Sequence, residues 1–307
     1  GAALSASPRA RCTWGKGASG EPVYLVGDSN AGHFSESAVG AASTLGRRLV
    51  VSTDNACPFI DLAIEDTSIP LVDGKKQALI VLPHGGPHGI YDSWYFDEEA
   101  QLLASRGYAV LQINYRGSGS KGGKFIEAGY KNWGTNIVND LVDGLNWAKN
   151  QPGIDGERIC AYGGSFGAYA SMMLEINQPG LLKCVAGYAG LYDLNTLFEK
   201  QGIPSDKYLS NYFKKAVGDD PEKLKKYSPL YNADKIRVPV FLAHGGNDER
   251  TTPGQAIRMH EALERSNPGH EWMFVETEGH GFYNMRHERE FYDRLLKFLD
   301  KHLKTAN

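Results

Sequence analysis

Long apolar segments are missing from this 307-residue sequence, and so is a strong excess of charge of either sign. No run reaches the roughly 18 apolar residues of a transmembrane helix, so we expect no membrane span. The formal net charge is only −3, and the lysines and arginines are scattered along the chain. Nucleic-acid-binding proteins usually concentrate basic residues on one face, so we expect neither a nucleic-acid nor an anionic-membrane partner.

Cysteine is scarce as well, because the chain has only 4, too few for a disulfide scaffold. Cys160 and Cys184 lie in apolar, strand-like segments, and we expect them to be buried core thiols. Cys12 and Cys57 could pair with each other, which would imply an extracytoplasmic, oxidising compartment; without that pair we expect a cytoplasmic protein. The first residues lack the basic and apolar regions of a signal peptide, so we expect such a peptide to have been removed or never to have existed.

From about residue 78 the chain alternates short apolar runs with helical patterns. Continuous apolar runs predict strands that are covered on both faces, and apolar residues at a spacing of three to four predict helices. The predicted strands are 78–83, 108–114, 158–162, 182–189, 238–243 and 271–275. The predicted helices are 95–105, 136–150, 166–177 and 286–303. Such alternation indicates an α/β fold, with a mostly parallel central sheet flanked by helices.

Two stretches depart from this pattern. Residues 1–72 are rich in Gly, Ala and Ser and contain one strand-like run at 23–26, so we expect a small N-terminal α/β appendage there. The main domain is then 73–307, because a polar, turn-prone segment precedes it. Between residues 189 and 238 lies an insertion rich in Lys, Tyr and Asp, in which we expect short helices near the mouth of any site.

The strongest chemical signal is a G-x-S-x-G motif at residues 163–167, with Ser165 at its centre. It follows a predicted strand and precedes a predicted helix, which is the context in which this motif presents a nucleophilic serine. The glycines allow a tight turn, and the helix N-terminus directs backbone N–H groups at a developing oxyanion. Ser165 is therefore the predicted nucleophile.

A serine hydroxyl needs a base, and in this type of fold the chain order is serine, acid, histidine. Asp248 and His280 follow the strands at 238–243 and 271–275, and open α/β sheets place their sites at such carboxyl ends. The alternative interpretation is a turn residue for Asp248 and a glycine-flanked surface loop for His280. Four rivals lie in the insertion or away from the last strand: Asp219, Asp234, His244 and His260.

The segment 84–88, His-Gly-Gly-Pro-His, follows the first strand of the main domain. An oxyanion hole in this fold takes one backbone N–H from that loop and one from the residue after the nucleophile. We therefore predict Gly86 and Phe166 as the donors. A zinc site at His84 and His88 would lack further ligands at suitable spacing, so we expect His84 to bond neighbouring loops.

Several of these segments together resemble the prolyl oligopeptidase family of serine peptidases, most closely its acylaminoacyl-peptidase-like catalytic domains. The resemblance covers about residues 77–304. The matching words are HGGPH at 84–88, NYRGS at 114–118, WG at 133–134, GGSFG at 163–167, SP at 228–229, HG at 244–245 with Asp248, and GHGF at 279–282. The resemblance implies an α/β-hydrolase fold and a Ser165–Asp248–His280 triad. One departure is Glu249-Arg250-Thr251-Thr252-Pro253, where the family usually has Arg-Val-Pro; we expect it to affect packing more than chemistry.

The first 70 residues instead resemble the start of SGNH hydrolases attached to bacterial acyltransferases. The words are YLVGDSNAGH at 24–33 and DNACP at 54–58. In that family Ser29 would be the nucleophile, with a downstream Asp-x-x-His as acid and base. This sequence has no such motif, so we interpret Ser29 as a relic of a truncated fragment rather than a second site.

Together these residues predict hydrolysis through an acyl-enzyme, with no metal or organic cofactor. The sequence lacks the N-terminal β-propeller that covers the site in the resembled family, so we expect an open mouth and carboxylesterase activity on small acyl esters. The alternatives are an acylaminoacyl- or oligopeptidase-type serine peptidase and an inactive scaffold that acts as a binding module. Apolar surface left without a propeller would favour a homodimer. Five aromatic residues are candidates for the acyl pocket, with core packing as the alternative: Phe198, Tyr208, Tyr212, Phe213 and Tyr283.

Overall fold

The computed structural model describes residues 10–14, 23–27, 49–53, 74–93, 95–198 and 207–304. The chain divides into two units, Gly1–Ser68 with Asp92–Asp97, and Ile69–Tyr91 with Glu98–Asn307. The assignment of residues 1–72 as a separate segment stays a prediction. Within the described ranges, no helix combines the length and the apolar character that crossing a membrane requires.

The smaller unit contains a three-stranded sheet with the order β1-β3-β2. Its strands are β1 (Ala10–Trp14), β2 (Val23–Gly27) and β3 (Leu49–Thr53). Strand β3 pairs in parallel with β2 and antiparallel with β1. The strand expected at 23–26 is present, whereas β1 and β3 were not expected. Ser29 and Cys57 lie outside the described residues, and so does the side chain of Cys12, so the predictions about them stay predictions.

The larger unit contains a six-stranded sheet with the order β5-β4-β6-β7-β8-β9, in which every neighbouring pair is parallel. The strands are β4 (Gln77–Val81), β5 (Ala109–Leu111), β6 (Ile154–Gly164), β7 (Cys184–Tyr188), β8 (Val240–Gly245) and β9 (Glu271–Val275). The expected parallel sheet is therefore confirmed, with β6 longer and β5 shorter than expected.

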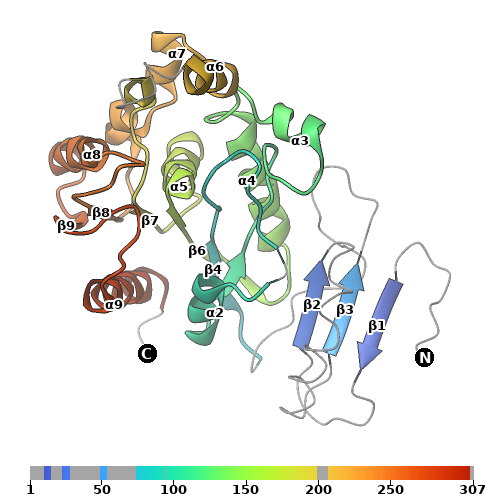
Figure 1. Cartoon of the computed structure of the whole chain (residues 1–307). Helices are drawn as coiled ribbons and strands as arrows, with labels where there is room; N and C mark the ends of the chain where they lie inside the picture. The colour runs from blue at the N-terminus through green and yellow to red at the C-terminus, as the bar shows by residue number, and fades with distance from the viewer. Residues whose placement is uncertain are drawn as a thin grey trace. The chain divides into compact units, whose positions relative to one another are not determined.

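Helices cover both faces of this sheet (Figure 1). On one face lie α4 (Asn136–Lys149), α5 (Phe166–Asn177) and α8 (Pro253–Ser266), and on the other lie α2 (Glu98–Ser105) and α9 (Met285–Leu303). Strand β4 shows why its sequence is apolar throughout. Leu79 and Val81 belong to the core beneath α4 and α5, whereas Ala78 and Ile80 belong to the core beneath α9. Successive residues of one strand therefore fill opposite layers.

The insertion between β7 and β8 forms short helices, as expected. They are η2 (Asn195–Phe198), α6 (Lys207–Ala216), α7 (Pro221–Lys226) and η3 (Pro229–Lys235). Two other helices, α3 (Gly123–Ala128) and α8, were not expected from the sequence. The buried side of α8 includes Ala256, Met259, Ala262 and Leu263, which recur at helical spacing, so the signal for this helix was present in the sequence.

The expectation that Cys160 and Cys184 are free thiols is wrong. Both side chains are buried, as expected, but they form a disulfide bond. Cys160 lies directly opposite Cys184 in the register of β6 and β7, with their Cα atoms 4.8 Å apart. Their separation of 24 residues along the chain conceals this pairing, because it depends on which strands become neighbours in the sheet.

Candidate active site

Ser165 occupies the turn between strand β6 and helix α5. Its φ of 56° and ψ of −120° place a non-glycine residue in the left-handed half of backbone space, a conformation that costs energy and is typical of a nucleophile elbow. The Ser165 N–H donates to the Tyr188 carbonyl at the end of β7, at 2.8 Å. The neighbouring strand therefore holds the turn that presents the serine.

Glycines on both sides of Ser165 permit the close packing of this turn. A Cβ atom at Gly163 would lie 2.6 Å from the backbone of Gly167. One at Gly167 would lie 2.0 Å from the carbonyl oxygen of Pro83. No side chain fits at these distances, so the motif keeps glycine where the strand, the helix and the loop after β4 meet.

The loop after β4 lies beside the predicted nucleophile. A Cβ atom at Gly85 would be 3.6 Å from Cβ of Ser165, which places this stretch next to the serine. Gly86, with a φ of 118°, is one predicted oxyanion donor. Phe166 is the other, and as the first residue of α5 its N–H has no partner within the helix. The aromatic ring of Phe166 is fully buried and anchors the start of α5.

His84 and His88 hold this loop in place. The Nε2 atom of His84 lies 2.7 Å from the Ser118 hydroxyl, and the Tyr115 hydroxyl donates to the His84 carbonyl at 2.7 Å. Burial lowers the pKa values of both histidines to about 4. Both rings are therefore neutral near pH 7, and His84 joins neighbouring loops as expected.

Asp248 follows β8 and its side chain is fully engaged. Oδ1 accepts hydrogen bonds from the N–H groups of Arg250 and Thr251, each at 2.8 Å. Oδ2 accepts from the Thr251 hydroxyl at 2.7 Å and from His280 Nδ1 at 2.8 Å. Burial by itself would raise the pKa of Asp248, but the hydrogen bonds from His280 and Thr251 outweigh it and hold the pKa below its usual value. The carboxyl group is therefore an ionised acceptor at neutral pH.

His280 lies in the loop between β9 and α9. Because its Nδ1 donates to the ionised Asp248, the hydrogen bond fixes the tautomer and leaves Nε2 as an acceptor. The imidazole is only partly buried, with 18% of the side chain exposed. This arrangement suits a general base, because one ring nitrogen is accessible to substrate while the other is held by the carboxylate.

The structure brings Asp248 and His280 together, and it presents Ser165 at the end of β6, which β7 separates from β8 in the sheet. The Ser165 hydroxyl forms no hydrogen bond with His280 among the described residues. Such bonds are often long without substrate and shorten in the reacting complex. The hydrogen bond therefore supports Asp248 and His280 as an acid–base pair directly. The role of Ser165 as nucleophile is supported by its place in the fold.

Glu278 organises the loop that carries His280, a role not predicted from the sequence. Its carboxylate accepts hydrogen bonds from the N–H of Tyr283 at 2.9 Å, the N–H of Asn284 at 3.2 Å and Nδ1 of His287 at 2.7 Å. Its backbone carbonyl accepts from the N–H of Asn247, next to Asp248, at 2.8 Å. One buried residue thus connects the loop of the base, the loop of the acid and the start of α9. The Glu-Gly-His-Gly sequence around it was the available signal.

The rival residues lie elsewhere. His244 is fully buried behind the acid, where its Nε2 donates to the Thr251 carbonyl at 2.9 Å, and burial lowers its pKa. His260 pairs with His270 at 2.7 Å and stacks on Trp272. Asp219 and Asp234 are exposed in the insertion. Among the described residues, none of these four forms hydrogen bonds with both His280 and Ser165.

The five predicted pocket residues are distributed unevenly. Tyr212 of α6 reaches the loop after β4, with its hydroxyl 3.2 Å from Nδ1 of His88. Phe213 packs against the core beneath α4 and α5. Tyr208 and Tyr283 are 82% and 81% exposed, and the side chain of Phe198 lies outside the described residues. Their role in an acyl pocket stays a prediction.

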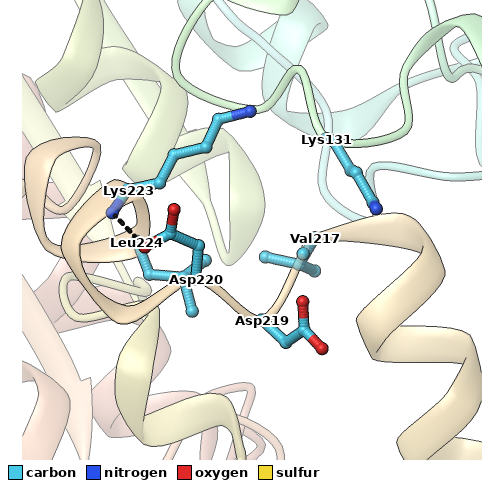
Figure 2. Close-up of a pocket in the computed structure, with 7 residues that line it drawn as sticks. Lys131, Val217, Asp219, Asp220, Lys223 and Leu224 are labelled. Atoms are coloured by element: carbon cyan, nitrogen blue, oxygen red, sulfur yellow. Dashed lines mark hydrogen bonds between the residues drawn. The ribbon is translucent and has the colours of Figure 1, made fainter.

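A separate cavity of about 210 Å³ lies where α6, α7 and the segment before α4 meet (Figure 2). It contains none of the predicted site residues. Its lining residues are Lys131, Val217, Gly218, Asp219, Asp220, Lys223 and Leu224. The carboxylate of Asp220 already accepts from the N–H groups of Glu222 and Lys223 at the start of α7. The charges in this cavity are balanced, and we assign it no function.

Known proteins share sequence and fold with this chain. The sequence matches the model of the prolyl oligopeptidase family over residues 94–306. It is 31% identical over 287 residues to dipeptidyl aminopeptidase BIII of Pseudoxanthomonas mexicana, an alignment that covers 88% of this chain and 41% of that protein. The chain therefore spans less than half the length of this curated relative.

Two solved structures are similar to the larger unit. The acylaminoacyl peptidase of Pyrococcus horikoshii matches with a TM-score of 0.69 and 26% identity, over 78% of this chain and 39% of that one. A puromycin-hydrolyzing peptidase of Mycobacterium tuberculosis matches with a TM-score of 0.69 and 28% identity, over 76% of this chain and 35% of that one. The larger unit has the α/β-hydrolase fold that the sequence predicted.

Proposed function

Because the chain belongs to the prolyl oligopeptidase family, we propose that it acts as a serine peptidase through Ser165, His280 and Asp248. The observation that carries this proposal is the 2.8 Å hydrogen bond from His280 Nδ1 to the buried carboxylate of Asp248. It leaves His280 Nε2 as the base, and Ser165 lies at the elbow after β6, which is the context of a nucleophile.

In the first step Ser165 Oγ attacks the substrate carbonyl while His280 Nε2 takes its proton. Asp248 stabilises the imidazolium that results, because its ionised carboxylate already faces Nδ1. The N–H groups of Gly86 and Phe166 would bind the oxyanion of the tetrahedral intermediate, at about 3 kcal/mol for each donor. The intermediate collapses when His280 returns the proton to the leaving amine.

In the second step His280 removes a proton from water, which attacks the acyl-enzyme on Ser165. The acid is released and the serine recovers its proton. Both steps use groups of this chain and water. The donors at Gly86 and Phe166 serve both tetrahedral intermediates, since the oxyanion forms at the same carbonyl oxygen.

The names of the relatives favour amide over ester substrates. They are a dipeptidyl aminopeptidase, an acylaminoacyl peptidase and a puromycin-hydrolyzing peptidase. We propose short peptides and acyl-amino-acid amides as the substrate class. This replaces carboxylesterase activity as the main interpretation, although the same acyl-enzyme also forms from esters.

A paired assay tests the proposal, with an acetyl-alanine p-nitroanilide, a dipeptidyl p-nitroanilide and a short-chain p-nitrophenyl ester as substrates. We expect wild type to cleave an anilide, and Ser165→Ala to lower kcat by about 10⁴-fold or more. Cleavage of the ester with no anilide cleavage would support the carboxylesterase alternative. Activity that survives Ser165→Ala would reject the nucleophile.

Labelling with a fluorophosphonate probe tests the binding-module alternative. We expect covalent modification of wild type at Ser165 and none of Ser165→Ala, as read by mass spectrometry. His280→Asn should also react slowly, because the hydroxyl then lacks its base. A folded wild type that resists the probe would favour an inactive scaffold.

A further inference from the structure

Thr251 lies between the acid and the base of the site. Its side-chain oxygen is 2.7 Å from Asp248 Oδ2, 2.8 Å from the carbonyl oxygen of Ala189 and 3.2 Å from His280 Nδ1. The residue is buried, with 4% of its surface exposed. The expectation that the departure at 249–253 affects packing more than chemistry does not account for these contacts.

We propose that Thr251 is a positioning residue that sets the geometry and the proton affinity of the Asp248–His280 pair. This inference rests on the proposed function, since it concerns the same base. Three bonds already surround Asp248 without the hydroxyl: two backbone N–H groups on Oδ1 and His280 Nδ1 on Oδ2. The hydroxyl is a second donor on Oδ2, the same oxygen that faces the base.

The single hydroxyl proton of Thr251 has two acceptors, the Asp248 carboxylate and the Ala189 carbonyl. Donation to the carboxylate is charge-assisted and therefore the stronger of the two. It withdraws negative charge from Oδ2, and so weakens the support that Asp248 gives to a protonated His280. In agreement, the hydrogen bond from the Thr251 side chain is among the causes that lower the pKa of Asp248.

The contact with Ala189 extends this arrangement toward the nucleophile. Ala189 directly follows Tyr188, whose carbonyl holds the N–H of Ser165 at 2.8 Å. Ala189 itself has a φ of 48° and donates its N–H to Ala243 in β8 at 2.9 Å. Thr251 thus lies between the acid–base pair and the end of β7 that holds the serine elbow.

Other titratable groups that face the pair carry little charge toward it. His244 of β8 lies 3.4 Å from Asp248 Oδ2 and is neutral because burial lowers its pKa. Tyr188 of β7 is also neutral, because burial raises its pKa. Glu278 is ionised, but His287 of α9 and two backbone N–H groups hold its carboxylate. A change in the pH profile on altering Thr251 therefore reports on Asp248 and His280.

The test compares pH profiles of kcat/KM for wild type, Thr251→Val and Thr251→Ser with the best substrate from the paired assay. Valine keeps the shape and removes the hydroxyl; serine keeps the hydroxyl. For Thr251→Val we expect kcat to fall roughly tenfold with KM within about twofold, because the loss of a bond that orients Asp248 and His280 outweighs the stronger support for a protonated His280. Without the second donor the pair takes up a proton more readily, so the acidic limb moves to higher pH. Thr251→Ser should retain both the wild-type kcat and the wild-type position of the acidic limb.

Thr252→Val is the matched control, because Thr252 is the next residue, is exposed, and makes no side-chain bond at the start of α8. It should leave the profile unchanged. An acidic limb of Thr251→Val that coincides with wild type, or moves to lower pH, would overturn the proposal, even if stability falls. If Thr251→Val does not fold, Thr251→Ala and Thr251→Ser form the second pair, since both lose the methyl and differ in the hydroxyl. Equal profiles for that pair would reject the role, whereas wild-type inactivity on every substrate would reject the proposed function instead.

Discussion

Glu278 Oε1 and His287 Nδ1 lie 2.7 Å apart and join the loop of the predicted base to the first turn of α9. The same carboxylate accepts two backbone N–H groups from the residues just before that helix. Glycines flank His280 on both sides, so the loop has little conformational restriction of its own. Its order therefore comes from Glu278.

Replacing Glu278 should loosen the base without touching substrate. For Glu278→Ala we expect kcat to fall roughly tenfold with KM nearly unchanged, because the charge-assisted bonds that hold the loop are lost. Glu276→Gln, in the same loop but exposed, is the control and should behave like wild type. Steady-state kinetics and a melting curve check both variants. Equal kcat values for the two variants would show that the loop holds its own shape.

Acid should release the same loop. Burial would raise the pKa of Glu278, but the hydrogen bonds from His287 and the two N–H groups outweigh it and lower the pKa below 4.5. A carboxyl group whose pKa is lowered by folding stabilises the protein when the pH is above its pKa in the unfolded chain. This stabilisation is lost as the pH falls through its pKa in the folded protein. We therefore expect the stability difference between wild type and Glu278→Gln to shrink below about pH 4.5. Urea titrations at pH 3.5, 5 and 7 measure this difference, and a constant difference would contradict the assignment.

Glu175 of α5 presents the opposite case. Its side chain is fully buried, and among the described residues neither carboxyl oxygen has a partner at good hydrogen-bond geometry, although the Arg237 backbone N–H lies near enough to oppose the rise in pKa. Burial raises its pKa from 4.5 to about 7. Because the folded pKa is the higher one, its contribution to stability is fully present below pH 4.5 and is lost as pH rises through 7.

The substitution Glu175→Gln removes this titration and keeps the shape. Relative to that variant, wild type should lose about 3 kcal/mol of unfolding free energy between pH 4.5 and pH 7.5. Urea unfolding of both proteins across this range gives the difference directly. Parallel curves for the two proteins would mean that Glu175 is solvated or paired in solution.

The sequence suggested the parts of the candidate site that depend on local pattern. Ser165, Asp248 and His280 each follow a strand, and apolar runs identify those strands. The parallel sheet then brings their carboxyl ends to one edge. Of the predicted contacts, the bond between Asp248 and His280 is present in the structure.

Contacts that depend on packing were not visible in the sequence. The Cys160–Cys184 bond needs β6 and β7 to be neighbours in a particular register. The Thr251 hydroxyl reaches the Ala189 carbonyl, 62 residues away in the chain, only because β7 and β8 are neighbours in the sheet. Both depend on tertiary geometry, which residue type and spacing do not determine.

The glycine of the serine elbow offers a sharp packing test. Gly167 and Gly254 are each the second residue of a helix, α5 and α8. A Cβ atom at Gly167 would lie 2.0 Å from the Pro83 carbonyl, whereas none of the described atoms lies within 4 Å of one at Gly254. We expect Gly167→Ala to lose about 3 kcal/mol or more and to react poorly with fluorophosphonate. Gly254→Ala should be neutral or stabilising by up to about 1 kcal/mol. Similar stability for the two variants would contradict the packing of the loop after β4 against α5.

The last prediction concerns the contact between α6 and the loop after β4. Trp133 Nε1 lies 3.4 Å from His88 Nε2 and can only donate, so Nε2 accepts and Nδ1 carries the hydrogen toward the Tyr212 hydroxyl. Tyr212→Phe removes this acceptor and keeps the ring. Because His88 lies two residues after Gly86, we expect a two- to fivefold rise in KM for peptide substrates. The change Tyr227→Phe, at the end of α7 and outside the predicted pocket, should leave KM unchanged. Equal KM values for the two variants would show that α6 does not contribute to substrate binding and that Tyr212 has only a packing role.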